Sequence, residues 1–187
     1  MVNIGIIIGS TRDARVSRQV AEYILEKSKD VETAEFEIVD IKEYDLPLFN
    51  ETVPPAMANK SYENSEQSRW SKKVDELDGF IFITPEYNNT ITPSLKNAFD
   101  YLGSEWGNKA AGIVTYGSTL GIAAQLSLRH ILSNFNVATV GPAGAFSLFT
   151  DFEEMATFRP SDVHNPTIQA LLETTAAWSN ALKSVRA

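Results

Sequence analysis

The sequence predicts an α/β protein with a five-stranded parallel sheet of order 2-1-3-4-5 and helices on both faces. Short apolar runs rich in β-branched residues alternate five times with stretches whose apolar residues recur at helical spacing. The runs are apolar on both faces, as expected for strands covered on both sides. Five strands fit this order better than the longer sheet of the usual dinucleotide-binding fold.

The first half of the chain supplies two strands and two helices. Residues 3–8 include four isoleucines, and Gly9 ends this first strand. Helical spacing follows over residues 16–29, and a second strand is predicted over residues 36–41. The polar residues 49–64 form a long loop in this prediction, and a second helix is expected around residues 70–77.

The second half repeats the alternation. Strands are predicted at residues 79–84, 110–116 and 137–140, with a resumption of the last at Ala145. Helical spacing is found at residues 93–102, 124–132 and 166–182. Thr92-Pro93 and Asn165-Pro166 are typical helix starts, in which a capping side chain precedes a first-turn proline.

Composition restricts the function classes. The 187 residues form one predicted domain, residues 1–187, and the net charge of −8 argues against binding to nucleic acid or to acidic membranes. No apolar segment approaches the roughly 20 residues needed to span a bilayer. The chain has no cysteine, which excludes disulfides and thiolate nucleophiles, and no pair of close histidines, so no metal site is predicted. A cytoplasmic protein is expected.

The turn after the first strand is a candidate anion site. Ser10, Thr11 and Arg12 precede a helix start, where free backbone N–H groups and the helix dipole favour negative charge. The turn lacks the Walker and Gly-x-Gly-x-x-Gly patterns, and a tyrosine phosphatase would need a cysteine. Ser10, Arg12 and Ser17 suit a terminal monophosphate. Alternatively, the two serines only cap the helix and Arg12 is solvated.

Two further polar loops are expected beside this turn. Pro85-Glu86-Tyr87-Asn88 follows the third strand, and residues 117–121 follow the fourth. Because the carboxyl ends of parallel strands meet at one edge, all three loops belong to the ligand-binding edge of the predicted sheet. The second loop combines an aromatic ring with backbone amides, which suits a flat heterocycle.

These motifs together resemble the NADPH-dependent FMN reductase family, which includes related quinone and azo-dye reductases. The resemblance is carried by Gly9-Ser10-Thr11-Arg12 with Ser17, by Pro85-Glu86-Tyr87-Asn88 with residues 95–100, and by Tyr116-Gly117. It implies a flavodoxin-like three-layer sandwich that binds FMN and assembles as a homodimer or homotetramer. Ser118 and Arg18 depart from residues common in the family.

The resemblance also implies roles for particular residues. Ser10, Arg12 and Ser17 would hold the FMN phosphate. The isoalloxazine and ribityl chain would be lined by Pro85, Glu86, Tyr87 and Asn88, with Gly117 and Ser118 at the other edge of the ring. Hydride would pass from NADPH or NADH through FMN to a small electron acceptor, so no catalytic side chain is predicted. Arg15 is a weaker candidate, for the 2′-phosphate of NADPH.

The predicted function is an FMN-dependent NAD(P)H oxidoreductase acting on quinones, azo compounds or free flavin. A flavodoxin-like electron carrier and a non-catalytic FMN-binding module are the alternatives. The long loop at residues 49–64 and the Pro-Glu-Tyr-Asn turn favour the enzyme, because flavodoxins rarely need either feature. The same loop is a candidate arm that covers a neighbouring subunit's flavin.

Overall fold

The computed structural model describes residues 1–186 and has the predicted central sheet, with strand order β2-β1-β3-β4-β5 and all pairings parallel. The strands are β1 Val2–Ile8, β2 Ala34–Asp40, β3 Gly79–Pro85, β4 Ala110–Gly117 and β5 Ala138–Ser147. The helices are α1 Ser17–Lys27, α2 Ser65–Glu76, α3 Pro93–Asp100, α4 Ile122–Asn134 and α5 Asn165–Arg186.

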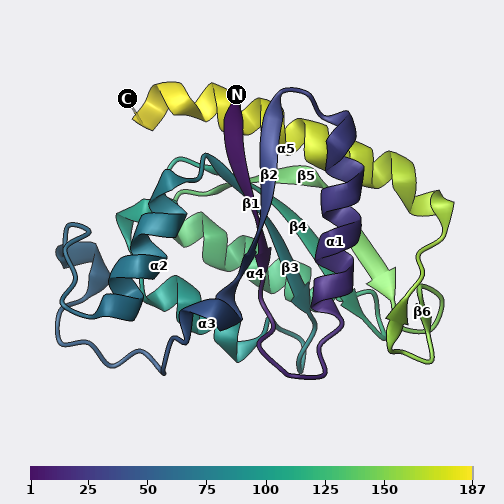
Figure 1. Ribbon diagram of the computed structural model, residues 1–187, viewed down its shortest axis with the longest axis horizontal. Coiled ribbons are helices and arrows are strands. Elements are labelled where there is room, and N and C mark those ends of the chain that lie inside the picture. Colours follow the sequence, from purple (N-terminus) through teal and green to yellow (C-terminus); the bar gives the residue numbers. More distant parts are fainter. Residues whose placement is uncertain (187) are drawn as a thin grey trace.

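The helices cover both faces of the sheet and bury two apolar clusters (Figure 1). Helices α1 and α5 pack on one face, where Ile24 and Leu171 meet strand residues such as Ile6. Helices α2, α3 and α4 cover the other face, around a group of aromatic side chains that includes Trp70 and Phe82. Successive side chains of a strand point to opposite faces of the sheet. Because helices cover both faces, the strands must be apolar at nearly every position, and this is the pattern in the sequence.

The strand ends place the three polar loops together. In Figure 1 the carboxyl ends of the strands lie at the bottom of the view, where the loop from β1 to α1 is seen. Strand β1 lies between β2 and β3. The chain passes from β1 to β2 on one side and then crosses back to β3 on the other side, so the strand order changes direction at β1, which is where such sheets bind ligands. The predicted start of α3 is confirmed, because the Thr92 side chain caps the helix by accepting from the N–H of Leu95 at 3.2 Å. The predicted start of α5 is also confirmed, since that helix begins at Asn165.

Strand β5 is longer and less regular than the sequence predicts. It runs without a break over Ala138–Ser147, although its register with β4 shifts between Ala111 and Ile113. Gly141 and Pro142 lie in this stretch, and an edge strand tolerates proline because one side of its backbone needs no partner. A two-stranded hairpin of β6 Phe152–Glu153 and β7 Thr157–Phe158, which the sequence did not predict, follows it.

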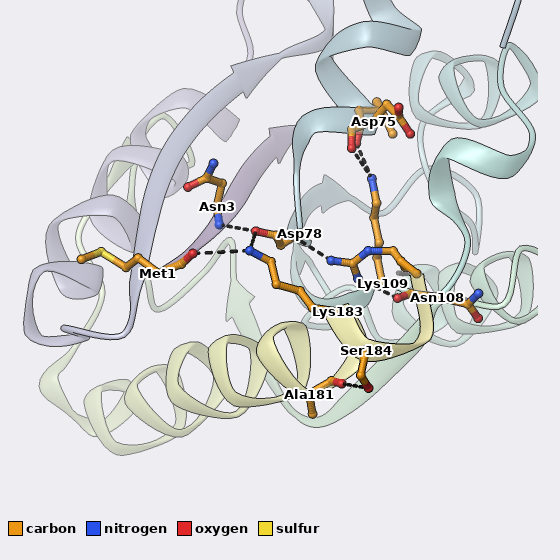
Figure 2. A network of polar contacts seen from close by, with 11 residues as sticks. Met1, Asn3, Asp75, Asp78, Asn108, Lys109, Ala181, Lys183 and Ser184 are labelled. Atoms are coloured by element: carbon orange, nitrogen blue, oxygen red, sulfur yellow. Dashed lines mark hydrogen bonds and ion pairs between the residues drawn. The ribbon is translucent and has the colours of Figure 1, made fainter.

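A polar network fastens α5 to the amino-terminal edge of the sheet (Figure 2). The Asp78 carboxylate accepts from the backbone N–H of Asn3 at 2.9 Å, from Lys183 Nζ at 2.9 Å and from Arg186 Nη2 at 2.8 Å. This one carboxylate therefore joins the start of β1, the residue before β3 and the last turn of α5.

Lys109 lies in the same region and is 3% exposed, with Nζ donating to the backbone carbonyls of Val74 at 2.6 Å and Asp75 at 3.1 Å. Burial lowers the pKa of Lys109 from 10.5 to about 8. The folded chain thus releases a proton that the unfolded chain keeps up to about pH 10.5. As the pH rises from 8 to 10.5, the free energy of unfolding should therefore increase by up to about 3 kcal/mol because of Lys109.

The increase is measured by denaturant titration of the natural chain and of K109M at several pH values. The free energy of unfolding of the natural chain should rise with pH relative to that of K109M. Lys72→Met, at an exposed position on α2, serves as the control and should leave the pH dependence unchanged. Parallel curves for the natural chain and K109M would contradict the prediction.

Candidate functional site

A cavity of about 330 Å³ opens at the carboxyl ends of β1, β3, β4 and β5. Seven of the nine residues predicted to bind the cofactor line it: Ser10, Arg12, Pro85, Glu86, Tyr87, Gly117 and Ser118. The other two, Ser17 and Asn88, do not. Six lining residues were not predicted as cofactor ligands: Ala14, Arg15, Val16, Tyr116, Leu148 and Met155.

The first wall of the cavity is the loop between β1 and α1. Its start is fixed by Gly9, where a Cβ atom would lie 2.9 Å from Leu95 Cδ2 and 3.0 Å from the carbonyl oxygen of Ile83. The Gly9 carbonyl accepts from the hydroxyls of Thr92 and Ser94 at the start of α3. Only glycine fits so close an approach, and the two hydroxyl groups hold the loop against α3.

This loop leaves backbone donors unused. Between Ser10 and Val16, only the N–H of Arg15 donates to a described protein atom, the carbonyl of Arg12 at 3.3 Å. The N-cap residue of α1, Val16, provides no side-chain cap. Free N–H groups at a helix start attract an anion, and Arg12 and Arg15 add positive charge at the same cavity.

Arg15 is half of a buried ion pair rather than a solvated side chain. Its side chain is 14% exposed, and Nη2 pairs with the carboxylate of Asp40, which is 4% exposed, at the end of β2. Its other terminal nitrogen, Nη1, is buried and has no hydrogen-bond partner among the described residues. The guanidinium is therefore held in place mainly by Asp40, and Arg15 is among the residues that line the cavity. A second ion pair, Lys42 with Asp13, also fastens the loop to the segment after β2.

Ser17 contacts Tyr116 in the structure and does not line the cavity. Its Oγ lies 2.6 Å from the hydroxyl oxygen of Tyr116, and both residues are buried. Burial raises the pKa of Tyr116 to about 12, so the phenol stays protonated at neutral pH. Ser17 therefore joins the start of α1 to the end of β4, and Tyr116 is the one of the pair that lines the cavity.

The second wall is the turn after β3. Tyr87 and Thr90 exchange backbone hydrogen bonds of 2.9 and 3.1 Å, and Asn88 and Asn89 between them have φ of 48° and 66°. Asparagine tolerates this left-handed conformation, which accounts for Asn88 at the exposed tip of the turn. The hydroxyl of Tyr87 accepts from Arg12 Nη1 at 3.4 Å, and the carboxylate of Glu86 points to the start of α4.

The remaining wall comes from the ends of β4 and β5. The carbonyl of Gly117 accepts from the N–H of Leu148 at 3.1 Å and from that of Leu120 at 3.3 Å, which joins the two segments. Leu148 and Met155 add apolar surface. Leu148 directly follows β5, whose end the irregular sequence pattern did not show, and Met155 lies in the turn between β6 and β7, a hairpin that the sequence did not predict.

Comparisons with known proteins agree on one family. The model of the NADPH-dependent FMN reductase family matches residues 2–151. The chain is 35% identical over 146 residues to an NAD(P)H-dependent FMN reductase of Nectria sp., covering 76% of this chain and 73% of that protein. It is 31% identical to an NAD(P)H-dependent FMN reductase of Saccharomyces cerevisiae, covering 91% and 95%.

Solved structures agree with the fold. The flavoenzyme NAD(P)H:(acceptor) oxidoreductase FerB of Paracoccus denitrificans superposes with a TM-score of 0.73 at 17% identity, covering 97% of this chain and 98% of that one. Such low identity supports the flavodoxin-like fold alone. The match over residues 2–151, together with relatives above 30% identity, shows that this chain belongs to the NADPH-dependent FMN reductase family.

Proposed function

We propose that this protein is an FMN-dependent NAD(P)H oxidoreductase that passes reducing equivalents to small acceptors. The observation that carries the proposal is the loop of free backbone N–H groups, with Arg12 and Arg15, that lines a cavity also bounded by Pro85, Tyr87 and Leu148. A ligand that fits both features has an anionic group at one end and a flat, partly apolar body. FMN has this chemistry, and membership of the family supports it.

The phosphate end of the proposed site is the loop of residues 10–16. Ser10 is 1% exposed, and its hydroxyl is available to donate to a phosphate oxygen beside Arg15 Nη1 and Arg12. The ion pair with Asp40 holds the Arg15 guanidinium in place before a ligand arrives. Because this positioning requires no rearrangement, less conformational entropy is lost on binding.

The ring end of the proposed site lies between the turn after β3 and the loop after β4. Pro85 and Tyr87 offer ring surfaces to a flat ligand, and Gly117 and Ser118 line the same cavity from the loop after β4. A Cβ atom on Gly117 would lie 3.3 Å from the backbone nitrogen of Gly121, a tight contact, and 3.4 Å from Glu86 Cβ, an ordinary one.

Bound FMN would supply the redox chemistry, because it accepts and donates two electrons while the protein sets its position and environment. The side chains described here bind and orient. Tyr116 is kept protonated by burial and serves as a neutral hydrogen-bond partner rather than as a base. We therefore propose binding roles for the seven predicted residues that line the cavity, and no acid or base.

The acceptor class follows from the relatives. They include a quinone reductase of Pseudomonas putida at 27% identity over 195 residues, covering 98% of this chain and 97% of that protein. An NADPH azoreductase of Bacillus sp. is 33% identical over 100 residues. We propose quinones, azo compounds or free flavin as acceptors, since these are the acceptor classes that the names of the relatives give.

The first test is an absorbance spectrum of the protein incubated with FMN, desalted and then treated with NADPH without oxygen. We expect retained flavin that loses its oxidised absorbance within seconds. Retained flavin that stays oxidised would identify an electron carrier instead. If no flavin is retained, turnover with excess FMN would show that FMN is a passing substrate, and absent turnover would overturn the proposal.

Organisation and location are further parts of the proposal. We propose one domain over residues 1–187, a homodimer or homotetramer, and a cytoplasmic location, with residues 49–64 as an arm toward a neighbouring flavin. Among residues 1–186, no helix is long and apolar enough to cross a membrane. A monomeric mass in solution, or full activity after shortening of the loop, would contradict the subunit contact.

A further inference from the structure

The start of α4 is capped by a residue from another strand. Helix α4 begins after Gly121, which has no side chain to cap the first free N–H groups and has φ of 71°. Glu86, at the end of β3, supplies the missing acceptor. Its Oε2 accepts from the N–H of Ala123 at 2.9 Å and of Ala124 at 3.1 Å, the second and third positions of the helix.

The same carboxylate reaches the loop that precedes the helix. Its Oε1 accepts from Thr119 Oγ1 at 3.3 Å, and the Glu86 backbone N–H donates to the carbonyl of Tyr116 at 3.0 Å. Glu86 is thus bonded on both sides of residues 117–121. A carboxylate at a helix start is also stabilised by the helix dipole.

This loop needs an external restraint. Leu120 has φ of 65°, a left-handed conformation that is unfavourable for leucine, and Gly121 beside it is also left-handed. A Cβ on Gly121 would approach Thr115 Cβ to 2.7 Å, so the loop lies tightly against β4. Unfavourable backbone conformations persist when the surrounding structure holds them, and the Glu86 contacts are part of that structure.

We propose that Glu86 is a positioning residue whose carboxylate, by capping α4 and bonding Thr119, fixes the Gly117–Gly121 wall of the cofactor cavity. This inference rests on the proposed function of that cavity as an FMN site. In this proposal the Glu86 side chain does not contact the flavin; it acts by holding residues 117–121 in place. The turn that contains Glu86 is the part that would line the flavin ring.

The test compares E86A and E86Q with the natural chain. Glutamine retains one side-chain oxygen that can accept from the two helix N–H groups, and alanine retains none. We expect E86A to bind FMN about tenfold more weakly, measured by quenching of flavin fluorescence, and E86Q to recover most of the affinity. In the apo protein, hydrogen exchange at the amides of Ala123 and Ala124 should accelerate in E86A and stay slow in E86Q.

Val74→Ala is the matched control for stability. Val74 lies on α2, is fully buried in the core on the other face of the sheet, and does not line the cavity. Its loss should lower the melting temperature by a few degrees, comparable with E86A, and leave FMN affinity unchanged. Natural affinity in E86A, or an equal loss of affinity in V74A, would overturn the proposal.

Two further arms keep the result decisive. If E86A does not fold, E86D replaces it, because aspartate keeps the charge but is one methylene shorter. We expect E86D to bind FMN more weakly than the natural chain. Natural affinity in E86D would overturn the inference. If the natural chain binds no FMN, the proposed function fails separately. The exchange rates of Ala123 and Ala124 then decide whether Glu86 holds the loop.

Discussion

Replacing Arg15 with methionine should weaken FMN binding roughly 10- to 100-fold, because a hydrogen bond to a charged group contributes about 1.5–3 kcal/mol. Arg15 lines the cavity beside the free backbone N–H groups of residues 10–16, and Asp40 holds its guanidinium. A phosphate bound there would therefore lie beside this positive charge. The dissociation constant is measured by flavin fluorescence without nucleotide present.

The single variant also leaves Asp40 buried without its cation, which destabilises the fold. The double variant R15M/D40N removes this complication, since asparagine still accepts from the N–H of Lys42 that Asp40 Oδ1 binds at 3.1 Å. We expect the double variant to regain stability but not FMN affinity. Natural affinity in the double variant would exclude Arg15 as a phosphate ligand.

Arg18→Met is the matched control. Arg18 lies one turn further along, exposed and paired with Glu22 on the outer side of α1. An exposed pair of this kind contributes little, so FMN affinity should stay within about twofold of the natural value. An alternative role for Arg15 in reading the 2′-phosphate of NADPH predicts a different result, an unchanged FMN affinity and a loss of preference for NADPH over NADH.

Replacing Trp106 with alanine should destabilise the protein by about 3–5 kcal/mol, the usual range for deleting a buried large aromatic side chain. The indole is fully buried. Its ring centroid lies 4.9 Å from that of Phe99, 5.2 Å from that of Phe80 and 5.9 Å from that of Trp70. For a chain of this size the melting temperature should fall by roughly 10 °C or more.

Two variants make this result specific. Trp178, on α5, is 44% exposed, and W178A should change stability by less than about 0.5 kcal/mol. Trp106 Nε1 is buried without a partner among the described residues, so W106F removes an unsatisfied donor and should cost much less than W106A. An unchanged melting temperature in W106A would contradict the assignment of Trp106 to the core.

The Trp106 variant also separates a role in the core from a role in cofactor binding. In the structure Trp106 packs among aromatic residues beneath α2 and α3 and does not line the cofactor cavity. Below its unfolding temperature, W106A should therefore bind FMN with nearly natural affinity.

The sequence alone predicted the elements and the edge where the polar loops meet. Apolar runs, helical spacing and cap-and-proline starts are local patterns, set by backbone sterics and by the period of side chains along one element. Parallel strands then require the loops after β1, β3 and β4 to share an edge. Seven of the nine predicted cofactor residues line one cavity for this reason.

Only the tertiary structure decided how individual side chains are used. Ser17 pairs with Tyr116, 99 residues away, Arg15 pairs with Asp40, 25 residues away, and Glu86 caps α4 at Ala123, 37 residues away. None of these contacts has a local pattern, because each depends on which strands are neighbours and how tightly the loops pack. The sequence predicted an anion site at the turn after β1, and packing determined which side chains line the cavity there.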